Sequence, residues 1–200
     1  MGDASRAIKL CEQALAIARE IRDRRSEGQN LGNLGIAYQD LGEAHKAIGF
    51  YEKALVIARE IKDQYNEGYF LGSLGNAYLL SGDIHKAIGF YEQILAIHRE
   101  IGDRHGEGLD LGNLGIAHNR LGDTDKAIKF YEQALVIARE IGDRRNEGNW
   151  LFNFGLALYS LSEKEKAIIS VKQALAIYEA IESPNMQKAR ELLKKWGGGD

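Results

Sequence analysis

Five histidines and one cysteine are the side chains whose chemistry could make a site in this 200-residue chain. His45 and His85 stand at equivalent places on successive helices of one type, so at least one interaxial distance of about 8–10 Å separates them. A shared metal would need ligands about 2 Å from one ion, so we expect no metal site. His118 falls on the core face of a helix and is expected to be a packed core residue. His98 and His105 flank one turn and could meet.

No catalytic motif is present. The sequence lacks the glycine-rich phosphate loops, the His-Glu-x-x-His helix, the Cys-x-x-Cys pair and the Gly-x-Ser-x-Gly elbow. The acidic residues read as helix caps or surface charges, and no pair of carboxylates stands in an apolar setting that would raise a pKa. Cys11 occupies the position of Tyr51, Tyr91 and Tyr131 in later copies of a repeat, so we interpret it as a small core residue. We therefore expect no enzyme activity and no cofactor.

The charge pattern also excludes classes of partner. The formal net charge is −3, with acidic and basic residues interspersed, which argues against a nucleic-acid surface. No apolar run approaches the roughly 20 residues of a membrane span, and no signal peptide precedes the first helical pattern. One cysteine gives no disulfide framework, which fits a reducing compartment. We expect a cytoplasmic protein without nucleic-acid or membrane partners.

The chain is organised by a forty-residue repeat. A fixed period of this size is typical of a stacked array, in which each unit buries its apolar face against its neighbours. The expected parts are a half repeat at 3–22, four full repeats at 23–62, 63–102, 103–142 and 143–182, and a capping helix at 184–196. The chain opens on half a repeat, which suggests that it was cut from a longer array or designed from one.

Each repeat contains two helical patterns. In the third, Leu111, Leu114, His118 and Leu121 share one face at spacings of three, four and three. Asp103 is placed to cap this first helix, Gly122 to end it, and Asp123 to cap the second helix. The second helix carries a wider apolar stripe, as expected of an element packed on two sides. The pattern predicts an all-α solenoid of about ten helices.

The glycines recur with the period, although each costs about 1 kcal/mol inside a helix relative to alanine. Gly35 and its copies at 75, 115 and 155 are expected to face the small residues Ala47 and Ala54, so that paired helices approach closely. Gly32, Gly72 and Gly112 have no such evident partner and would leave room for a bound backbone.

The repeat resembles the tetratricopeptide repeat. The matching residues are Leu31, Leu34, Gly35, Tyr38, Ala47 and Tyr51, against the pattern W-x2-L-G-x2-Y and A-x3-F. The period is longer than the family's usual length of about 34, and the closing proline is absent. The forms LGNLGIAY and KAIxFYEQALxIAREIGDR are similar to the long repeats of Pins-type adaptors, kinesin light chains and bacterial regulators. The resemblance implies a right-handed superhelix whose first helices line a concave groove.

A partner is expected along that groove. With Leu31, Leu34, Tyr38 and Leu41 on the core face, the opposite faces of the first helices mix apolar residues with asparagine, which can donate to and accept from a peptide backbone. The candidate peptide-binding residues are Gln29, Asn33, Ile36, Tyr69, Asn76, Leu80, Leu109, Asn113, Ile116, Arg120, Asn149, Asn153 and Leu156. The sequence thus predicts a protein-interaction scaffold that binds an extended peptide.

Other readings stay open. The asparagines could instead bond only between neighbouring helices. The first helix, at 3–22, has no polar outer face, so the array could stack head to tail as an oligomerisation element, and the near-identical repeats also fit a designed scaffold. Chaperone-tail binders of the family hold a carboxylate with Lys, Arg and Asn. The corresponding places here carry Gly32, Ile36, Gly72, Asn76, Gly112 and Ile116, so no such clamp is expected.

Overall fold

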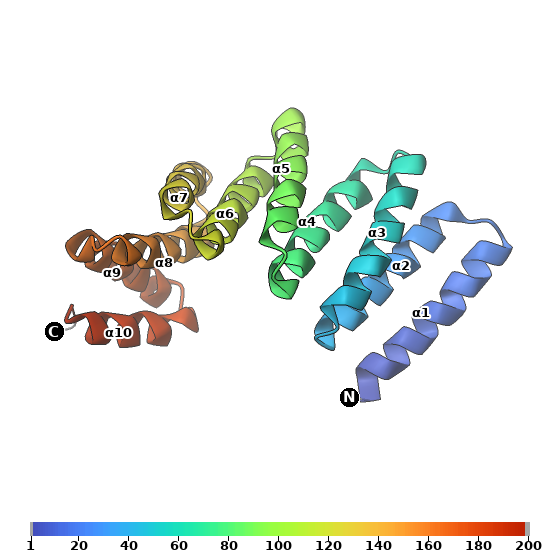
Figure 1. Ribbon diagram of the computed structural model, residues 1–200, viewed down its shortest axis with the longest axis horizontal. Helices are drawn as coiled ribbons and strands as arrows, with labels where there is room; N and C mark the ends of the chain where they lie inside the picture. The colour runs from blue at the N-terminus through green and yellow to red at the C-terminus, as the bar shows by residue number, and fades with distance from the viewer. Residues whose placement is uncertain (1, 199–200) are drawn as a thin grey trace. The chain divides into compact units, whose positions relative to one another are not determined.

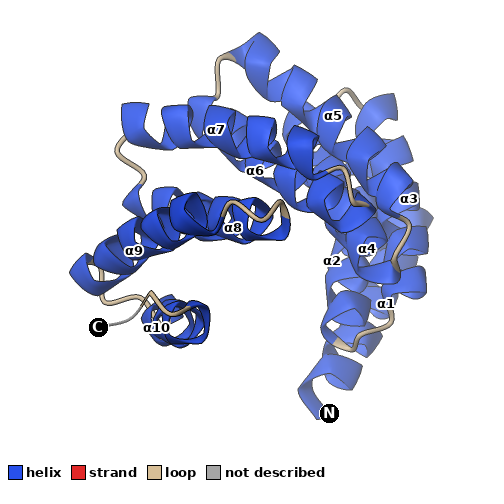
Figure 2. Cartoon of the chain, turned by 60° about the vertical axis from the view of Figure 1, so that its left-hand side comes forward, coloured by secondary structure: helices blue, strands red, loops and turns tan. Residues whose placement is uncertain are grey.

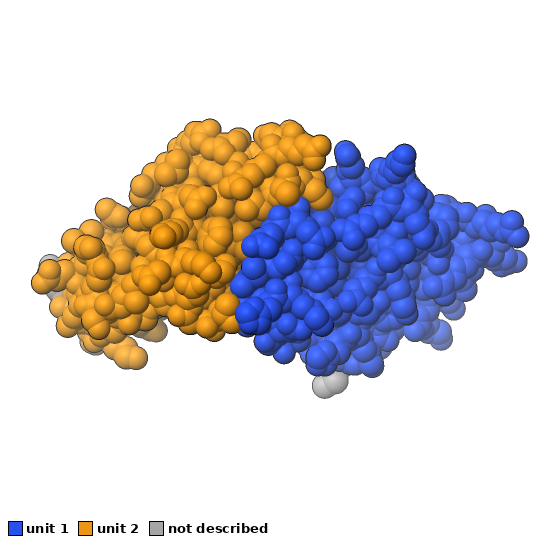
Figure 3. All heavy atoms as spheres, turned by 45° about the horizontal axis from the view of Figure 1, so that its top comes forward, with its two compact units in different colours: residues 1–94 blue, residues 95–200 orange. Residues whose placement is uncertain are grey.

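The computed structural model describes residues 2–198, with side chains from Ser5 onward. The chain divides into two compact units, Met1–Ile94 and Leu95–Asp200, which Figure 3 colours separately. The division falls inside one helix, within the second forty-residue repeat. Each unit is described by itself below.

Every regular element between residues 2 and 198 is a helix, and successive helices are joined by short loops (Figures 1 and 2). The elements are α1 (Gly2–Glu20), α2 (Arg24–Asp40), α3 (Ala44–Glu60), α4 (Gln64–Ser81), α5 (Ile84–Ile101), α6 (Arg104–Leu121), α7 (Thr124–Glu140), α8 (Arg144–Ser160), α9 (Lys164–Ala180) and α10 (Asn185–Trp196). The prediction of an all-α fold with about ten helices is confirmed.

Aspartates begin the first helix of each repeat as the sequence predicts. Asp23, Asp63, Asp103 and Asp143 each accept a hydrogen bond from the backbone N–H three residues later, at 2.9–3.2 Å. Asp123 caps α7 in the same way, through the N–H of Lys126. These bonds satisfy N–H groups that the helix itself leaves without a partner.

About every twenty residues, a helix is followed by a residue with a positive φ angle. Gly122 adopts φ 88° after α6, and Gly142 adopts φ 72° after α7. Glycine enters this left-handed region without a steric penalty, so it can end a helix at little cost in free energy. Lys62 and Glu182 adopt the same conformation, at φ 55° and 51°.

Within each of the first three repeats, a tyrosine of the second helix fills the notch left by a glycine of the first. A Cβ added at Gly35 would lie 2.5 Å from Cε1 of Tyr51. The same distance holds for Gly75 against Tyr91 and for Gly115 against Tyr131. The expectation that these glycines face Ala47 and Ala54 was therefore wrong for Gly35, Gly75 and Gly115, because the space is occupied by a fully buried ring. At Gly155 an added Cβ would lie 3.1 Å from the carbonyl oxygen of Ala167, the counterpart of Ala47.

The core follows the leucines of the first helices. Leu31, Leu34 and their copies in the second and third repeats are 0–2% exposed. Leu41, expected on the same face, is exposed because it is the residue that ends α2. Cys11, expected in the core, is only half-buried, because no helix covers that side of α1 among the described residues.

Ion pairs join each second helix to the first helix that follows. Arg19 to Glu27, Arg59 to Glu67, Arg99 to Glu107 and Arg139 to Glu147 all have Nε–Oε1 distances of 2.8–2.9 Å. In the third of these pairs Glu107 also binds Arg104, so one largely buried carboxylate bridges two arginines. These contacts explain the repeated sequence ARE…D…EG, whose charges form a junction between repeats.

Gly35→Ala should lower the melting temperature, since the added methyl would overlap the Tyr51 ring and overpacking of this kind typically costs about 1–3 kcal/mol. Gly49→Ala is the matched control, because a Cβ at Gly49 meets no atom within 4 Å. That variant should melt at or above the wild-type temperature, since alanine favours the helix by about 1 kcal/mol. Circular dichroism measures both. Equal melting of the two variants would show that the notch is not under steric constraint.

Candidate functional site

In the first unit, the candidate residues lie on the surface. Gln29, Asn33 and Ile36 of α2 are exposed, as are Tyr69, Asn76 and Leu80 of α4. Each helix buries its leucine face and turns this mixed apolar and amide face outward. The first unit therefore presents two such faces, one on α2 and one on α4.

In the second unit, the corresponding residues are more enclosed. Leu109, Asn113 and Ile116 of α6 are half-buried, and Arg120 near the end of that helix is exposed. On α8, the candidate residues Asn149, Asn153 and Leu156 are half-buried. The second unit thus offers a partly sheltered surface.

The asparagines divide into two groups. Asn76 Oδ1 accepts a hydrogen bond from the Tyr91 hydroxyl at 2.7 Å, and Asn149 Oδ1 accepts one from Tyr178 at 3.1 Å. These two amides therefore link helices, as the alternative reading supposed. The side chains of Asn33, Asn113 and Asn153 have no hydrogen-bond partner in the described part of the chain.

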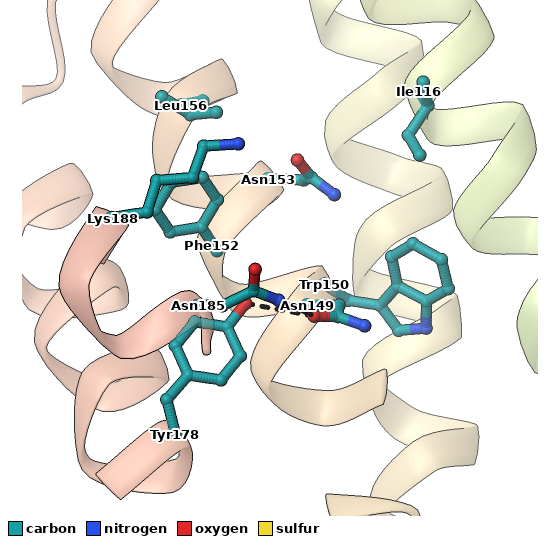
Figure 4. Close-up of a pocket in the computed structure, with 9 residues that line it drawn as sticks. All are labelled: Ile116, Asn149, Trp150, Phe152, Asn153, Leu156, Tyr178, Asn185 and Lys188. Atoms are coloured by element: carbon teal, nitrogen blue, oxygen red, sulfur yellow. Dashed lines mark hydrogen bonds between the residues drawn. The ribbon is translucent and has the colours of Figure 1, made fainter. Parts of the chain in front are cut away.

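A pocket of about 320 Å³ lies in the second unit (Figure 4). It brings together four candidate residues, Ile116 of α6 and Asn149, Asn153 and Leu156 of α8. Its other lining residues are Trp150, Phe152, Tyr178, Asn185 and Lys188. Its wall therefore combines apolar side chains, three asparagine amides and one cation.

Five of the lining residues were not expected from the sequence. Trp150 stands where other repeats have asparagine, phenylalanine or aspartate, Phe152 replaces a repeat glycine, and Tyr178 replaces a repeat alanine. Asn185 and Lys188 come from α10, which lies outside the repeat pattern. The Lys188 ammonium lies 5.5 Å from the centroid of the Phe152 ring, and Asn185 Nδ2 donates to Asn149 Oδ1 at 3.3 Å. The departures from the repeat were a visible signal, but the sequence did not show that they converge.

The glycines expected to make room for a bound backbone do not all do so. The position of a Cβ on Gly32 is occupied by the Phe70 ring, and that on Gly112 by the Trp150 ring. Each ring comes from the first helix of the next repeat, so these glycines serve helix packing. That expectation was wrong for Gly32 and Gly112. Gly72 is less crowded, with Cδ1 of Ile94 at 3.4 Å from the same point.

The family model for the tetratricopeptide repeat matches residues 1–60, 29–100, 67–140 and 110–180. The chain belongs to the tetratricopeptide repeat family. No curated protein matches it in sequence.

Solved tetratricopeptide solenoids are similar to this chain in fold. Kinesin light chain repeats of Podosopora anserina match with a TM-score of 0.76 and 20% identity, over 90% of this chain and 89% of that one. The apo form of RapI matches with a TM-score of 0.89 and 17% identity, over 97% and 71%. A Rap protein complexed with competence and sporulation factor matches with a TM-score of 0.74 and 18% identity, over 90% and 52%. At these identities the likeness shows the fold alone.

The histidines of the tetratricopeptide array have separate environments. His45 and His85 are exposed, and His118 is buried with its ring stacked on Phe130, centroids 5.2 Å apart. His105 Nδ1 lies 3.2 Å from an oxygen of Asp143. Within residues 2–198, no group of three or more His, Cys, Asp or Glu side chains could hold a metal ion.

His98 does not meet His105. Its Nδ1 lies 2.7 Å from Oδ2 of Asp110, a nearly fully buried carboxyl group of α6. The neighbouring Gly106 leaves room for the imidazole, because a Cβ there would lie 2.5 Å from His98 Nδ1. Position 98 is alanine or tyrosine in the other repeats, position 106 is serine or asparagine, and position 110 is asparagine or an aromatic residue. Three departures from the repeat thus meet at one place.

Burial raises the pKa of Asp110 to about 6, although the hydrogen bond from His98 acts in the opposite direction. Only pairs of carboxylates were considered from the sequence, so a single buried carboxyl group with a raised pKa was not anticipated. An aspartate on a helix gave no sign of burial by itself, so the three departures from the repeat were the visible signal of this pair.

In the described part of the chain, no helix is long and apolar enough to cross a membrane.

Asp110→Asn should change how stability depends on pH. The pKa of Asp110 in the folded protein, about 6, lies above its ordinary value of 3.8, so the folded state holds this proton more tightly than the unfolded chain. Asp110 therefore lowers stability as pH rises from about 4 to 6. The wild type should lose melting temperature across that window relative to Asp110→Asn, measured by calorimetry. Parallel curves for the two proteins would contradict the raised pKa.

Proposed function

We propose that this tetratricopeptide array is a non-enzymatic scaffold of the cytoplasm that binds an extended segment of a partner protein on the outward faces of its first helices. The observation that carries the proposal is the group of asparagines without partners, Asn33, Asn113 and Asn153, each beside an exposed or half-buried apolar residue. An amide in this state can donate to and accept from a peptide backbone without breaking a bond inside the protein.

The pocket of the second unit is the best-formed part of this surface (Figure 4). Its volume of about 320 Å³ suits one or two side chains of a bound segment. Ile116, Leu156 and Phe152 supply apolar contact, and Asn153 supplies an available amide. We propose that the segment runs across α6 and α8, with one apolar side chain in this pocket.

Asn149 has a different part in this arrangement. Its Oδ1 is held by Tyr178 and by Asn185 of α10. These bonds fix the wall of the pocket before a ligand arrives, which lowers the entropy cost of binding. Asn113 and Asn153 are therefore the residues expected to contact the ligand backbone, and Asn149 is expected to position the wall.

The family and the fold agree with this proposal. Solenoids use extended surfaces built from several repeats to bind other chains. One structure similar in fold is a Rap protein complexed with competence and sporulation factor.

The double variant Asn113→Ala/Asn153→Ala should bind a peptide selected against the wild type at least tenfold more weakly, because two backbone hydrogen bonds are worth roughly 1 kcal/mol each. The peptide is obtained from a displayed random library, and affinity is measured by isothermal titration. The control is Gln93→Ala/Gln133→Ala, whose amides bond to the backbone of their own second helices. The control should bind like the wild type.

Equal affinity of the wild type and the asparagine variant would contradict the proposed surface. Weaker binding by both double variants would place the ligand elsewhere or indicate a loss of stability. The helicity and melting temperature of each variant are therefore measured first.

Self-association is the second candidate, because Leu10 and Ile17 of α1 and Ile21 directly after it are more than half exposed. Head-to-tail stacking would place α10 of one copy on this apolar face of the next copy. The side chains of Lys194 and Lys195 on α10 are exposed, and burying their charges against apolar residues would cost free energy of desolvation. Packing of α1 against α1 of a second copy avoids that cost. Self-association through α1 would thus cover an apolar face that no other part of the described chain covers.

Light scattering over a concentration series separates the two candidates. Self-association through α1 requires the mass to rise from that of one 22.3 kDa chain to twice that value, and Ile17→Lys to abolish the rise by placing a charge in the contact. A mass that stays constant with concentration removes self-association as a function.

A further inference from the structure

One charged side chain, that of Lys188 on α10, lines the pocket of Figure 4, and no carboxylate lines it. Within the described part of the chain, the Lys188 ammonium group makes no ion pair and no hydrogen bond to another residue. It lies 5.5 Å from the centroid of the Phe152 ring, which attracts the cation without neutralising its charge. The three N–H donors of this ammonium group are therefore available to a ligand.

The nearby carboxylates have other partners or lie outside the pocket. Glu191, one turn further along α10, accepts a hydrogen bond from a glutamine side chain of the same helix at 2.9 Å. Glu179 at the end of α9 lies 2.7 Å from Arg190. Glu182, in the loop between α9 and α10, is exposed and does not line the pocket. The positive charge of Lys188 is thus not matched by a carboxylate at the pocket wall.

A second donor stands beside this cation. In Figure 4 the Lys188 ammonium group and the Asn153 amide point into the same part of the pocket. Asn185 and Asn149 bond to each other at 3.3 Å and form a fixed wall, whereas the Asn153 amide has no hydrogen-bond partner among the described residues. A carboxylate has two oxygens that accept hydrogen bonds, and it carries one negative charge, so it suits the two donors that remain.

We propose that this part of the pocket binds an acidic side chain, aspartate or glutamate, of the partner segment, whose carboxylate accepts hydrogen bonds from Lys188 and Asn153. The inference rests on the proposed function, because it names the chemistry of the segment that the array binds. That segment also places an apolar side chain in the pocket. In an extended chain, side chains two residues apart lie on the same side at a spacing of about 7 Å, so one segment can supply both groups.

The charge of the pocket selects a carboxylate among the anions. A single ammonium group matches the single negative charge of an acidic side chain. A phosphate group carries nearly two negative charges and is typically bound by arginine side chains, and no arginine lines this pocket. A basic side chain of the ligand would meet Lys188 with no carboxylate between them, which disfavours it. Because Lys188 is exposed, the preference for an acidic residue should weaken as salt rises.

Selection of peptides from a displayed random library tests this specificity. The library is joined to its carrier at the C-terminal end of each peptide, so no terminal carboxylate is offered. Peptides selected against the wild type should share one acidic position. Peptides selected against Lys188→Glu should carry lysine or arginine at that position. A wild-type pool with no shared acidic position, or the same acidic position in the Lys188→Glu pool, overturns the proposal.

Titration calorimetry with one selected peptide, acetylated and amidated, measures the contact itself. A copy in which the acidic residue is replaced by its amide should bind the wild type at least threefold more weakly, and the two peptides should bind Lys188→Gln equally. The matched control is Lys195→Gln, because Lys195 is an exposed lysine of the same helix that does not line the pocket. The control should keep the threefold preference of the wild type.

Loss of the preference in both lysine variants would show a long-range effect of charge and overturn the contact with Lys188. A free-acid peptide whose binding is abolished by amidation would identify a terminal carboxylate as the ligand, which also overturns the proposal.

Failure of this inference differs from failure of the proposed function. Selected peptides that bind Asn113→Ala/Asn153→Ala as tightly as the wild type would overturn the proposed function and the inference together, as would a library that yields no peptide. Peptides that lose affinity for the asparagine variant but bind Lys188→Gln like the wild type would overturn only the acidic side chain and leave the proposed function standing.

Discussion

The packing of a tyrosine ring into a glycine notch is the contact on which the rest of the array depends. It fixes the distance between the two helices of each of the first three repeats, because a Cβ at Gly35, Gly75 or Gly115 would overlap the ring. Once that distance is set, the leucines of the first helix are covered completely and its opposite face is turned outward. The outward orientation of the mixed apolar and amide surface therefore follows from the packing of glycine, tyrosine and leucine on the buried side of the first helices.

The junctions between repeats add a second constraint of a different kind. Each uses an arginine of one repeat and a largely buried glutamate of the next. Arg19 and Arg24 hold the pKa of Glu27 below its ordinary value, with the bond to Arg19 the larger cause. The exposed arginines limit what each pair contributes to stability, but the bond lengths hardly vary, so the junctions set a common registry.

The sequence predicted the helices, their aspartate caps and the buried leucines, because these depend on spacing and on local backbone bonds. It predicted less of the site. An asparagine amide is available to a ligand only if no residue distant in the sequence already bonds to it. Tyr91 bonds to Asn76 and Tyr178 bonds to Asn149 in this way. Trp150 and Phe70 entered the glycine notches of a neighbouring first helix, a contact that no pattern within one repeat contains. His98 and Asp110 were missed because burial of a polar pair is decided by tertiary packing.

The similarity of the junctions has a consequence for the length of such proteins. The segment 103–142 is joined to the preceding repeat by the ion pair of Arg99 and Glu107. It is joined to the following repeat by the pair of Arg139 and Glu147, which has almost identical geometry. A duplicate of that segment inserted after Gly142 would meet complementary surfaces on both sides. Gene duplication could thus lengthen this protein in steps of forty residues without a new interface having to evolve.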